Sequence, residues 1–375
     1  MEHYLDNAAT TRPCVEAVAA VNEMLEINYG NPSSTHKMGL QAEHRLNQAR
    51  EEIAQALKAK SGEIYFTSGG TEADNWAVIR GAEMGSKFGR HIITTAIEHD
   101  AVLNSVRYLE SIGYEATYLL PDSSGNINLH DLQKAIRPDT VLISMMLVNN
   151  ETGTILPVKQ ATQIIRSSGC NALIHTDAVQ GFLKIPFTPA SLGVDMITLS
   201  GHKIHGPKGV GALWIKPDIK LPPLIFGGGQ EQGRRSGTEG LPQIVGFGAA
   251  AKKATEDFES NRCKMLELRK LAESRLLSQF PDITIIGGGA PHILCFSIPG
   301  PGSEVLMNFL ESRGVYVSKG SACKKGHRSH VLTAMNLDPK IIDSAIRVSF
   351  SSYSTTDDVD ALIYAVSEAR QLLKY

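Results

Sequence analysis

Cysteine is scarce in this chain of 375 residues, and its cysteines lie far apart: Cys14, Cys170, Cys263, Cys295 and Cys323. No two of them form a C-x-x-C pair, and their number is odd. We therefore expect neither a disulfide framework nor a metal site built on cysteine. Three of them stand in apolar stretches typical of helices or strands, so we expect packing roles for Cys170, Cys263 and Cys295.

Long apolar runs and an excess of charge of one sign are also missing. No stretch approaches the roughly 20 apolar residues needed to cross a membrane. The first residues, MEHYLD, lack the basic and apolar regions of a signal peptide. The formal net charge is −2, so composition does not indicate a nucleic acid or a membrane surface as a partner. We therefore expect a cytoplasmic protein without direct contacts to either.

What is present is an alternation of strand-like and helix-like segments. Short apolar runs typical of buried strands occupy residues 63–67, 91–95, 114–119, 140–146, 172–177, 196–200 and 210–215. The alternation predicts an α/β fold with a mostly parallel sheet covered by helices. A helical pattern over 242–280 and short strands at 283–286 and 293–298 follow. We expect a large domain over 14–255 and a smaller α/β domain built from 1–13 and 256–375.

Polar motifs follow the expected strands, at the edge where such sheets bind ligands. TSGGTEAD (67–74) turns through two glycines into a helix, whose free N–H groups and Thr71 hydroxyl suit an anion. An ordinary helix cap is the alternative. EHD (98–100) places His99 where it can stack on a flat ligand or relay a proton. A histidine that forms hydrogen bonds within its own loop is the alternative.

Two further motifs offer amides and a carboxylate. VNNETG (148–153) presents two asparagines, which suit ligand binding or a turn. In HTDAVQ (175–180), Asp177 ends a buried strand, where a carboxylate needs a cationic partner or serves as a helix cap. Gln180 follows by one helical turn and can reach the same ligand.

A lysine stands in the most unusual motif, SGHKIHGPKG (200–209). Lys203 lies where a buried strand gives way to a loop rich in glycine. Desolvation there disfavours the ammonium form and frees the amine for attack on a carbonyl carbon. An ordinary exposed loop lysine is the alternative. An anion site, a carboxylate, an imidazole and such a lysine together suit one ligand, pyridoxal 5′-phosphate.

The chain resembles the NifS/IscS-like cysteine desulfurases of the class V aminotransferase fold, which are fold-type I pyridoxal-phosphate enzymes. The resemblance extends over nearly the whole chain and is carried by the motifs YLDNAATT (4–11), GNPSSTH (30–36), FTSGGTEADN (66–75), EHDAV (98–102), VNNETG (148–153), HTDAVQ (175–180), SGHKIHGPKGVG (200–211), RRSGTE (234–239), SKGSAC (318–323) and IRVSFSSYST (346–355).

The resemblance implies a role for each matching residue. Lys203 would hold the cofactor aldehyde, and His99 would stack on the ring and move protons. Asp177 would pair with the ring nitrogen, Gln180 would bond the ring oxygen, and Asn150 would lie beside the ring. The phosphate would be bound by Gly70, Thr71, Ser200 and His202, and by Thr238 of a neighbouring subunit in a homodimer. Arg347, helped by Asn31, would bind the substrate carboxylate, to which guanidinium is well suited.

Cys323 distinguishes a desulfurase from other members of the fold. It lies in a polar loop close to basic side chains, Lys324, Lys325, His327 and Arg328, which favour its thiolate. This loop is shorter than in many relatives, and its basic rim suits an acidic sulfur acceptor or a tRNA-modifying partner. An incidental exposed cysteine is the alternative.

The resemblance implies a cysteine desulfurase that gives L-alanine and a persulfide on Cys323. The sulfur would pass to an acceptor protein, either an iron–sulfur scaffold or a tRNA thiolation enzyme. Two alternatives stay open. A selenocysteine lyase or another β-eliminating lyase would not need Cys323. A catalytically silent scaffold that docks sulfur carriers would need neither Lys203 nor Asp177.

Overall fold

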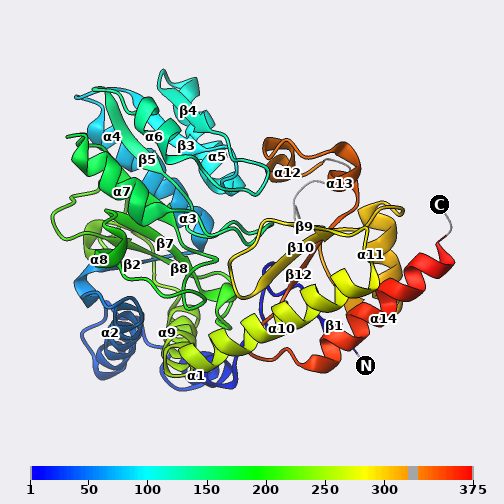
Figure 1. The fold of residues 1–375 in the computed structure, drawn as a ribbon. Helices are drawn as coiled ribbons and strands as arrows, with labels where there is room; N and C mark the ends of the chain where they lie inside the picture. The colour runs from blue at the N-terminus through cyan, green and yellow to red at the C-terminus, as the bar shows by residue number, and fades with distance from the viewer. Residues whose placement is uncertain (1, 320–327, 374–375) are drawn as a thin grey trace.

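The structure is a computed structural model that describes residues 2–319 and 328–373 (Figure 1). Over these residues, seven strands form the largest sheet in the order β2-β8-β7-β6-β5-β3-β4. Their bounds are β2 Ile64–Thr67, β3 His91–Thr95, β4 Glu115–Leu119, β5 Thr140–Ser144, β6 Leu173–Asp177, β7 Met196–Ser200 and β8 Gly211–Ile215. Only β8 runs against its neighbours within this described sheet. The expected mostly parallel sheet is confirmed.

Helices cover both faces of this sheet because its strands are apolar on both sides. Neighbouring residues of one strand, such as Ile92 and Ile93, belong to different hydrophobic clusters on opposite faces. One face packs against α3 (Gly70–Asn75), a π-helical turn (Trp76–Arg80), α4 (Gly81–Gly85) and α5 (Asp100–Ser111). The other packs against α1 (Val15–Glu26), α2 (Lys37–Leu57), α6 (Leu129–Ala135), α7 (Val158–Ser167), α8 (Pro189–Leu192) and α9 (Leu241–Glu256).

A second, smaller sheet is built from the C-terminal part of the chain (Figure 1). Its antiparallel order is β12-β10-β9, with bounds Ala345–Ser349, Ile293–Ser297 and Thr284–Ile286. A separate apolar core joins it to α10 (Phe258–Gln279), α11 (Ser303–Ser312) and α14 (Thr356–Leu372). Leu5 of the N-terminal segment is buried in this core, and β1 (His3–Tyr4) pairs with β11 (Val315–Tyr316). The helices α12 (His330–Ala334) and α13 (Pro339–Asp343) precede β12.

Two expectations need correction here. The helical pattern over 242–280 forms two helices, because Asp257 leaves helical geometry at φ −96° and ψ 10°. Cys263 was expected to pack, but it is exposed, since it lies off the buried stripe of α10 that holds Met265, Leu268, Ala272 and Leu276. Cys295 is buried and Cys170 is half-buried.

The boundaries 14–255 and 1–13 with 256–375 remain a proposal for the domains. They place the two sheets in different units, although Cys295 and Val331 pack with the core of the large sheet. None of the helices in the described part of the chain is long and apolar enough to cross a membrane.

Candidate active site

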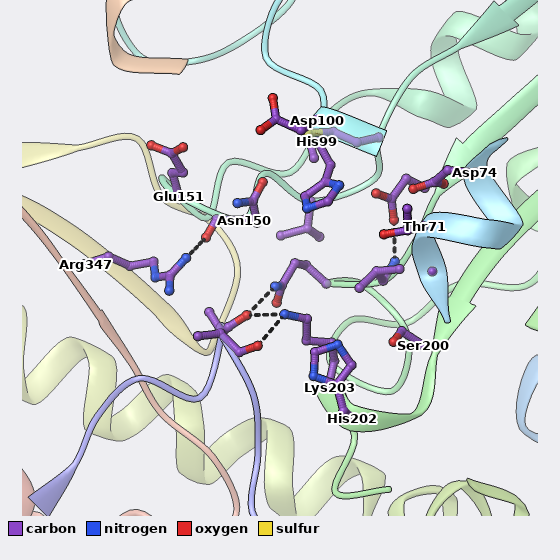
Figure 2. Close-up of a pocket in the computed structure, with 18 of the residues that line it drawn as sticks. Thr71, Asp74, His99, Asp100, Asn150, Glu151, Ser200, His202, Lys203 and Arg347 are labelled. Atoms are coloured by element: carbon purple, nitrogen blue, oxygen red, sulfur yellow. Dashed lines mark hydrogen bonds between the residues drawn. The ribbon is translucent and has the colours of Figure 1, made fainter. Parts of the chain in front are cut away.

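The carboxyl ends of the large sheet's parallel strands surround a cavity of about 280 Å³ (Figure 2). Strands that run in parallel bring the residues that follow them to one edge of the sheet. Many of the residues singled out in the sequence line this cavity together, namely Gly70, Thr71, His99, Asn150, Asp177, Gln180, Ser200, His202, Lys203 and Arg347.

Lys203 closes a short 3₁₀ turn directly after β7 (Figure 2). Its Nζ donates to the carbonyl oxygens of Ala8 and Ala9, both at 2.7 Å. Burial, together with the nearby charge of Arg347, lowers the pKa of this amine to about 8. Neutral, nucleophilic amine is therefore present near neutral pH, which an exposed loop lysine would not provide.

Asp177 ends β6 and is only 6% exposed. One of its oxygens accepts the Val179 N–H at 2.8 Å, so the residue also caps the following turn. Burial raises the pKa of this carboxyl, while the nearby His99 and Lys203 act in the opposite direction. A cation placed beside Asp177 in the cavity would therefore be stabilised.

Two buried acids at the cavity were missed in the sequence: Asp74 lines it, and Glu98 directly precedes the lining residue His99. Asp74 and Glu98 are 1% and 0% exposed, and each keeps one oxygen without a hydrogen-bond partner among the described residues. Burial raises the pKa of Asp74 well above its usual range and that of Glu98 to about 8. Burial therefore favours the protonated form of both acids, whereas the cations beside Asp177 act against the same effect there.

The start of α3 forms one end of the cavity, with Thr71, Ser200 and His202 around it (Figure 2). A Cβ atom at Gly70 would lie 3.0 Å from a methyl group of Val179, so glycine lets the chain pass tightly over β6 and β7. Burial lowers the pKa of His202 to about 4, so its ring is neutral and offers hydrogen bonds without charge.

At the same end, an acid is neutralised by a partner from a distant segment. Glu72 binds Arg235, with Oε1 at 2.8 Å from the arginine Nε. This pairing cancels a negative charge beside the expected anion site.

Arg347 projects into the other end of the cavity from β12. Its guanidinium donates to the Asn150 carbonyl oxygen at 2.8 Å (Figure 2). It also donates to the Asp6 carboxylate at 2.7 Å. Asp6, which the sequence reasoning overlooked, shows that a carboxylate is accommodated here. The neighbouring Asn149 binds the backbone of its own loop through its side chain, so the turn interpretation holds for that residue.

Two expected residues are not brought to the cavity. Asn31 and Thr238 are exposed and do not line it, and the Asn31 side chain accepts the Ser33 N–H. Cys323 lies outside the described residues. The chain on either side of residues 320–327 does reach the cavity, because Ser318 pairs with the Arg347 backbone and His330 is a lining residue.

Comparison with known proteins identifies the family of this chain. The family model of class-V aminotransferases matches residues 3–362. A protein of Methanosarcina thermophila named cysteine desulfurase IscS is 41% identical over 99% of this chain and 92% of its own length.

Solved structures similar to this chain include further members of this family. A NifS-like protein superposes with a TM-score of 0.94 at 40% identity, with both chains fully covered. A structure described as SspA in complex with cysteine reaches a TM-score of 0.82 at 34% identity, covering 95% of this chain and all of its own. The chain therefore belongs to the class-V aminotransferase family and, within it, to the NifS/IscS-like cysteine desulfurases.

Proposed function

We propose that this protein is a pyridoxal-phosphate-dependent cysteine desulfurase that transfers sulfur from L-cysteine to Cys323. One observation carries the proposal: a single cavity joins the Lys203 amine of lowered pKa, the buried Asp177 carboxyl and the carboxylate-binding Arg347. An aldehyde cofactor and an amino-acid substrate need these three groups side by side.

The residues of the cavity fit pyridoxal phosphate. Lys203 would hold its aldehyde carbon, and Thr71 at the start of α3 and Ser200 at the end of β7 would bind its phosphate. His99 would lie against the ring. The pKa of Asp177 is raised by burial, and a protonated ring nitrogen would supply the missing cation. When bound, the cofactor withdraws electrons from the substrate's α-carbon and so allows a proton to leave it.

The protein's own groups bind the substrate and move its protons. Arg347, now bonded to Asp6, would hold the substrate carboxylate through the same donors. The Nδ1 atom of His99 accepts the Ala101 N–H at 3.1 Å, so the neutral ring carries its proton on Nε2, where it can be donated. Lys203, once released from the aldehyde, is a base of suitable pKa for the α-proton.

Cys323 would take the sulfur. In the overall reaction the carbon–sulfur bond of L-cysteine breaks, a sulfur–sulfur bond to Cys323 forms, and the products are L-alanine and the persulfide. A relative solved with bound cysteine supports the choice of substrate. Ser318 pairs with the backbone of the lining residue Arg347, and His330 itself lines the cavity, so the chain on both sides of 320–327 lies close to it, which supports the choice of thiol.

We further propose a homodimer in which Thr238 of each subunit reaches the cofactor phosphate of the other. Exposed apolar side chains around α1 support an interface there: Val15, Leu25, Ile27 and Tyr29. The persulfide would then pass to a sulfur-acceptor protein, an iron–sulfur scaffold or a tRNA thiolation enzyme, in the cytoplasm.

The products formed from L-cysteine test this function. We expect the purified holoenzyme to release L-alanine and, with a thiol reductant, an equal amount of sulfide. Lys203→Ala should release neither, because it cannot hold the cofactor aldehyde. Pyruvate and ammonia in place of alanine would indicate a β-eliminating lyase, and turnover confined to selenocysteine would indicate a selenocysteine lyase. No visible cofactor absorbance and no product would indicate a silent scaffold.

A further inference from the structure

A histidine outside all of the expected motifs touches a residue of the cavity. His292 stands directly before β10 and is 1% exposed. Its Nε2 lies 3.2 Å from the side-chain oxygen of Gln180. Three successive glycines with positive φ, Gly287 to Gly289, bring the chain to this point along the turn that contains Thr152 and Thr154.

The hydrogen bonds of Gln180 define the orientation of its amide. Its nitrogen Nε2 donates to the Ala8 carbonyl oxygen at 2.9 Å. If the amide were reversed, its oxygen would face that carbonyl, and two acceptors would oppose each other. The amide oxygen therefore faces His292, and only a donor can satisfy it there.

The hydrogen bonds also determine which ring nitrogen of His292 carries the proton. Its Nδ1 is buried and has no hydrogen-bond partner among the described residues. A proton on Nδ1 would thus be a buried donor without an acceptor. The Nε2 atom would then carry no proton, and two acceptors, Nε2 and the Gln180 oxygen, would face each other. Burial, and then the nearby side chains of Lys184, Arg347 and Lys203, lower the pKa of His292 well below its usual range and so oppose a second proton. The neutral ring with its proton on Nε2 is the arrangement that satisfies these contacts.

We propose that His292 is a positioning residue, which holds the Gln180 amide so that its second N–H is presented to the cofactor in the cavity. Ala8 takes one of the two N–H groups of Gln180, and His292 occupies the oxygen. Gln180 lines the cavity, and its second N–H is taken by neither Ala8 nor His292. This inference deepens the proposed function, since it requires that the ring oxygen of pyridoxal phosphate accepts from Gln180.

The pH dependence of the bound cofactor's visible absorbance tests the proposal. An N–H donated to the ring oxygen favours its negative form. In His292→Leu that donor is no longer held, so we expect the midpoint of the absorbance change to move up by about one pH unit. His292→Gln, whose amide nitrogen can replace Nε2, should restore the midpoint. His91→Leu is the matched control, because His91 is equally buried but bonds Thr117 and Thr140 away from the cavity.

An unchanged midpoint in His292→Leu, or an equal change in His91→Leu, would overturn the proposal. A second measurement does not depend on the cofactor. In the cofactor-free protein, the ¹⁵N shifts of His292 should show a neutral ring with its proton on Nε2, and a proton on Nδ1 would contradict the assignment. If the wild-type protein shows no cofactor absorbance at all, the proposed function fails, whereas the nitrogen shifts still decide the role of His292.

Discussion

At the scale of single residues, burial decides which titratable groups of the cavity are charged. Burial shifts the pKa values of Lys203 and Glu98 in opposite directions. It lowers the pKa of the amine and raises the pKa of the carboxyl, each to about 8. Each shift disfavours the charged form. Burial therefore favours the neutral, nucleophilic form of Lys203 and the protonated form of Glu98.

The pKa of Lys203 predicts how the cofactor-free protein captures pyridoxal phosphate. The neutral amine is the nucleophile, so the rate of covalent capture should rise with pH, with a midpoint near the lowered pKa of about 8. Asp6 favours the charged amine, so Asp6→Asn should move this midpoint to lower pH. Stopped-flow absorbance measures both rates, and a midpoint near the ordinary lysine value of 10.5 would contradict the account.

Glu98 makes a prediction about stability. Its folded-state pKa of about 8 lies above the ordinary 4.5, so its stabilising contribution is complete below pH 4.5 and is lost as the pH rises towards 8. Glu98→Gln stays neutral and keeps an oxygen for the Thr95 and Met146 donors. Between pH 5 and 8, the melting temperature of the cofactor-free wild-type protein should therefore fall relative to that of the variant. Parallel melting curves would contradict the raised pKa.

At the scale of elements, the sequence predicts most of the site. Each motif directly follows a strand whose apolar run is visible in the sequence, and parallel strands bring such motifs to one edge. Asp74 and Glu98 escaped notice because a motif does not show which of its polar side chains turns inward. The contact of Asp6 with Arg347 joins residues 341 positions apart, and it depends on how the two sheets pack, which periodicity does not encode.

The loop that carries Thr238 is attached to α2 by a buried ion pair and to β2 by a backbone N–H. Glu231 forms two bonds to Arg50, at 2.6 and 2.7 Å, and accepts the Phe66 N–H of β2 at 2.9 Å. Its own φ of +49° places it in the left-handed region, which costs free energy for a residue other than glycine. The ion pair therefore stabilises a loop conformation that the backbone alone disfavours.

Removing one partner of this pair should be costly. Glu231→Ala leaves the Arg50 charge buried and unpaired, and we expect the free energy of unfolding to fall by about 3–5 kcal/mol. Glu259→Ala is the matched control, because its pair with Arg262 is at the surface, and it should change stability little. Denaturant unfolding compares the two variants, and equal losses would contradict a specific role for the buried pair.

At the scale of the whole molecule, the site needs both sheets and the N-terminal segment. Lys203 and Asp177 come from the large sheet, Arg347 comes from the small one, and Ala8 and Ala9 close over the lysine. The proposed homodimer would add Thr238 from a second subunit. The exposed position of Thr238, away from its own cavity, is what such an exchange requires.

Mixing two inactive variants tests this exchange. Lys203→Ala and Thr238→Glu should each be inactive as homodimers, the first for lack of the amine and the second through repulsion of the phosphate. After random exchange of subunits, each mixed dimer has one intact site, so about a quarter of wild-type activity should return. No recovery, with mixed dimers confirmed by native mass spectrometry, would place Thr238 at its own subunit's site. A Thr238→Glu homodimer that stays active would place Thr238 outside any site.

The central claim is that Cys323 accepts the sulfur of L-cysteine, and the mass of its peptide tests that claim directly. After treatment of the wild-type enzyme with L-cysteine and no reductant, mass spectrometry should find about 32 Da added to the Cys323 peptide, the mass of one sulfur held covalently during turnover. Cys323→Ser should bind cofactor and cysteine, but it should not release alanine at the normal rate. Sulfur on Cys14 or Cys170, or on no cysteine while alanine still forms, would contradict the account.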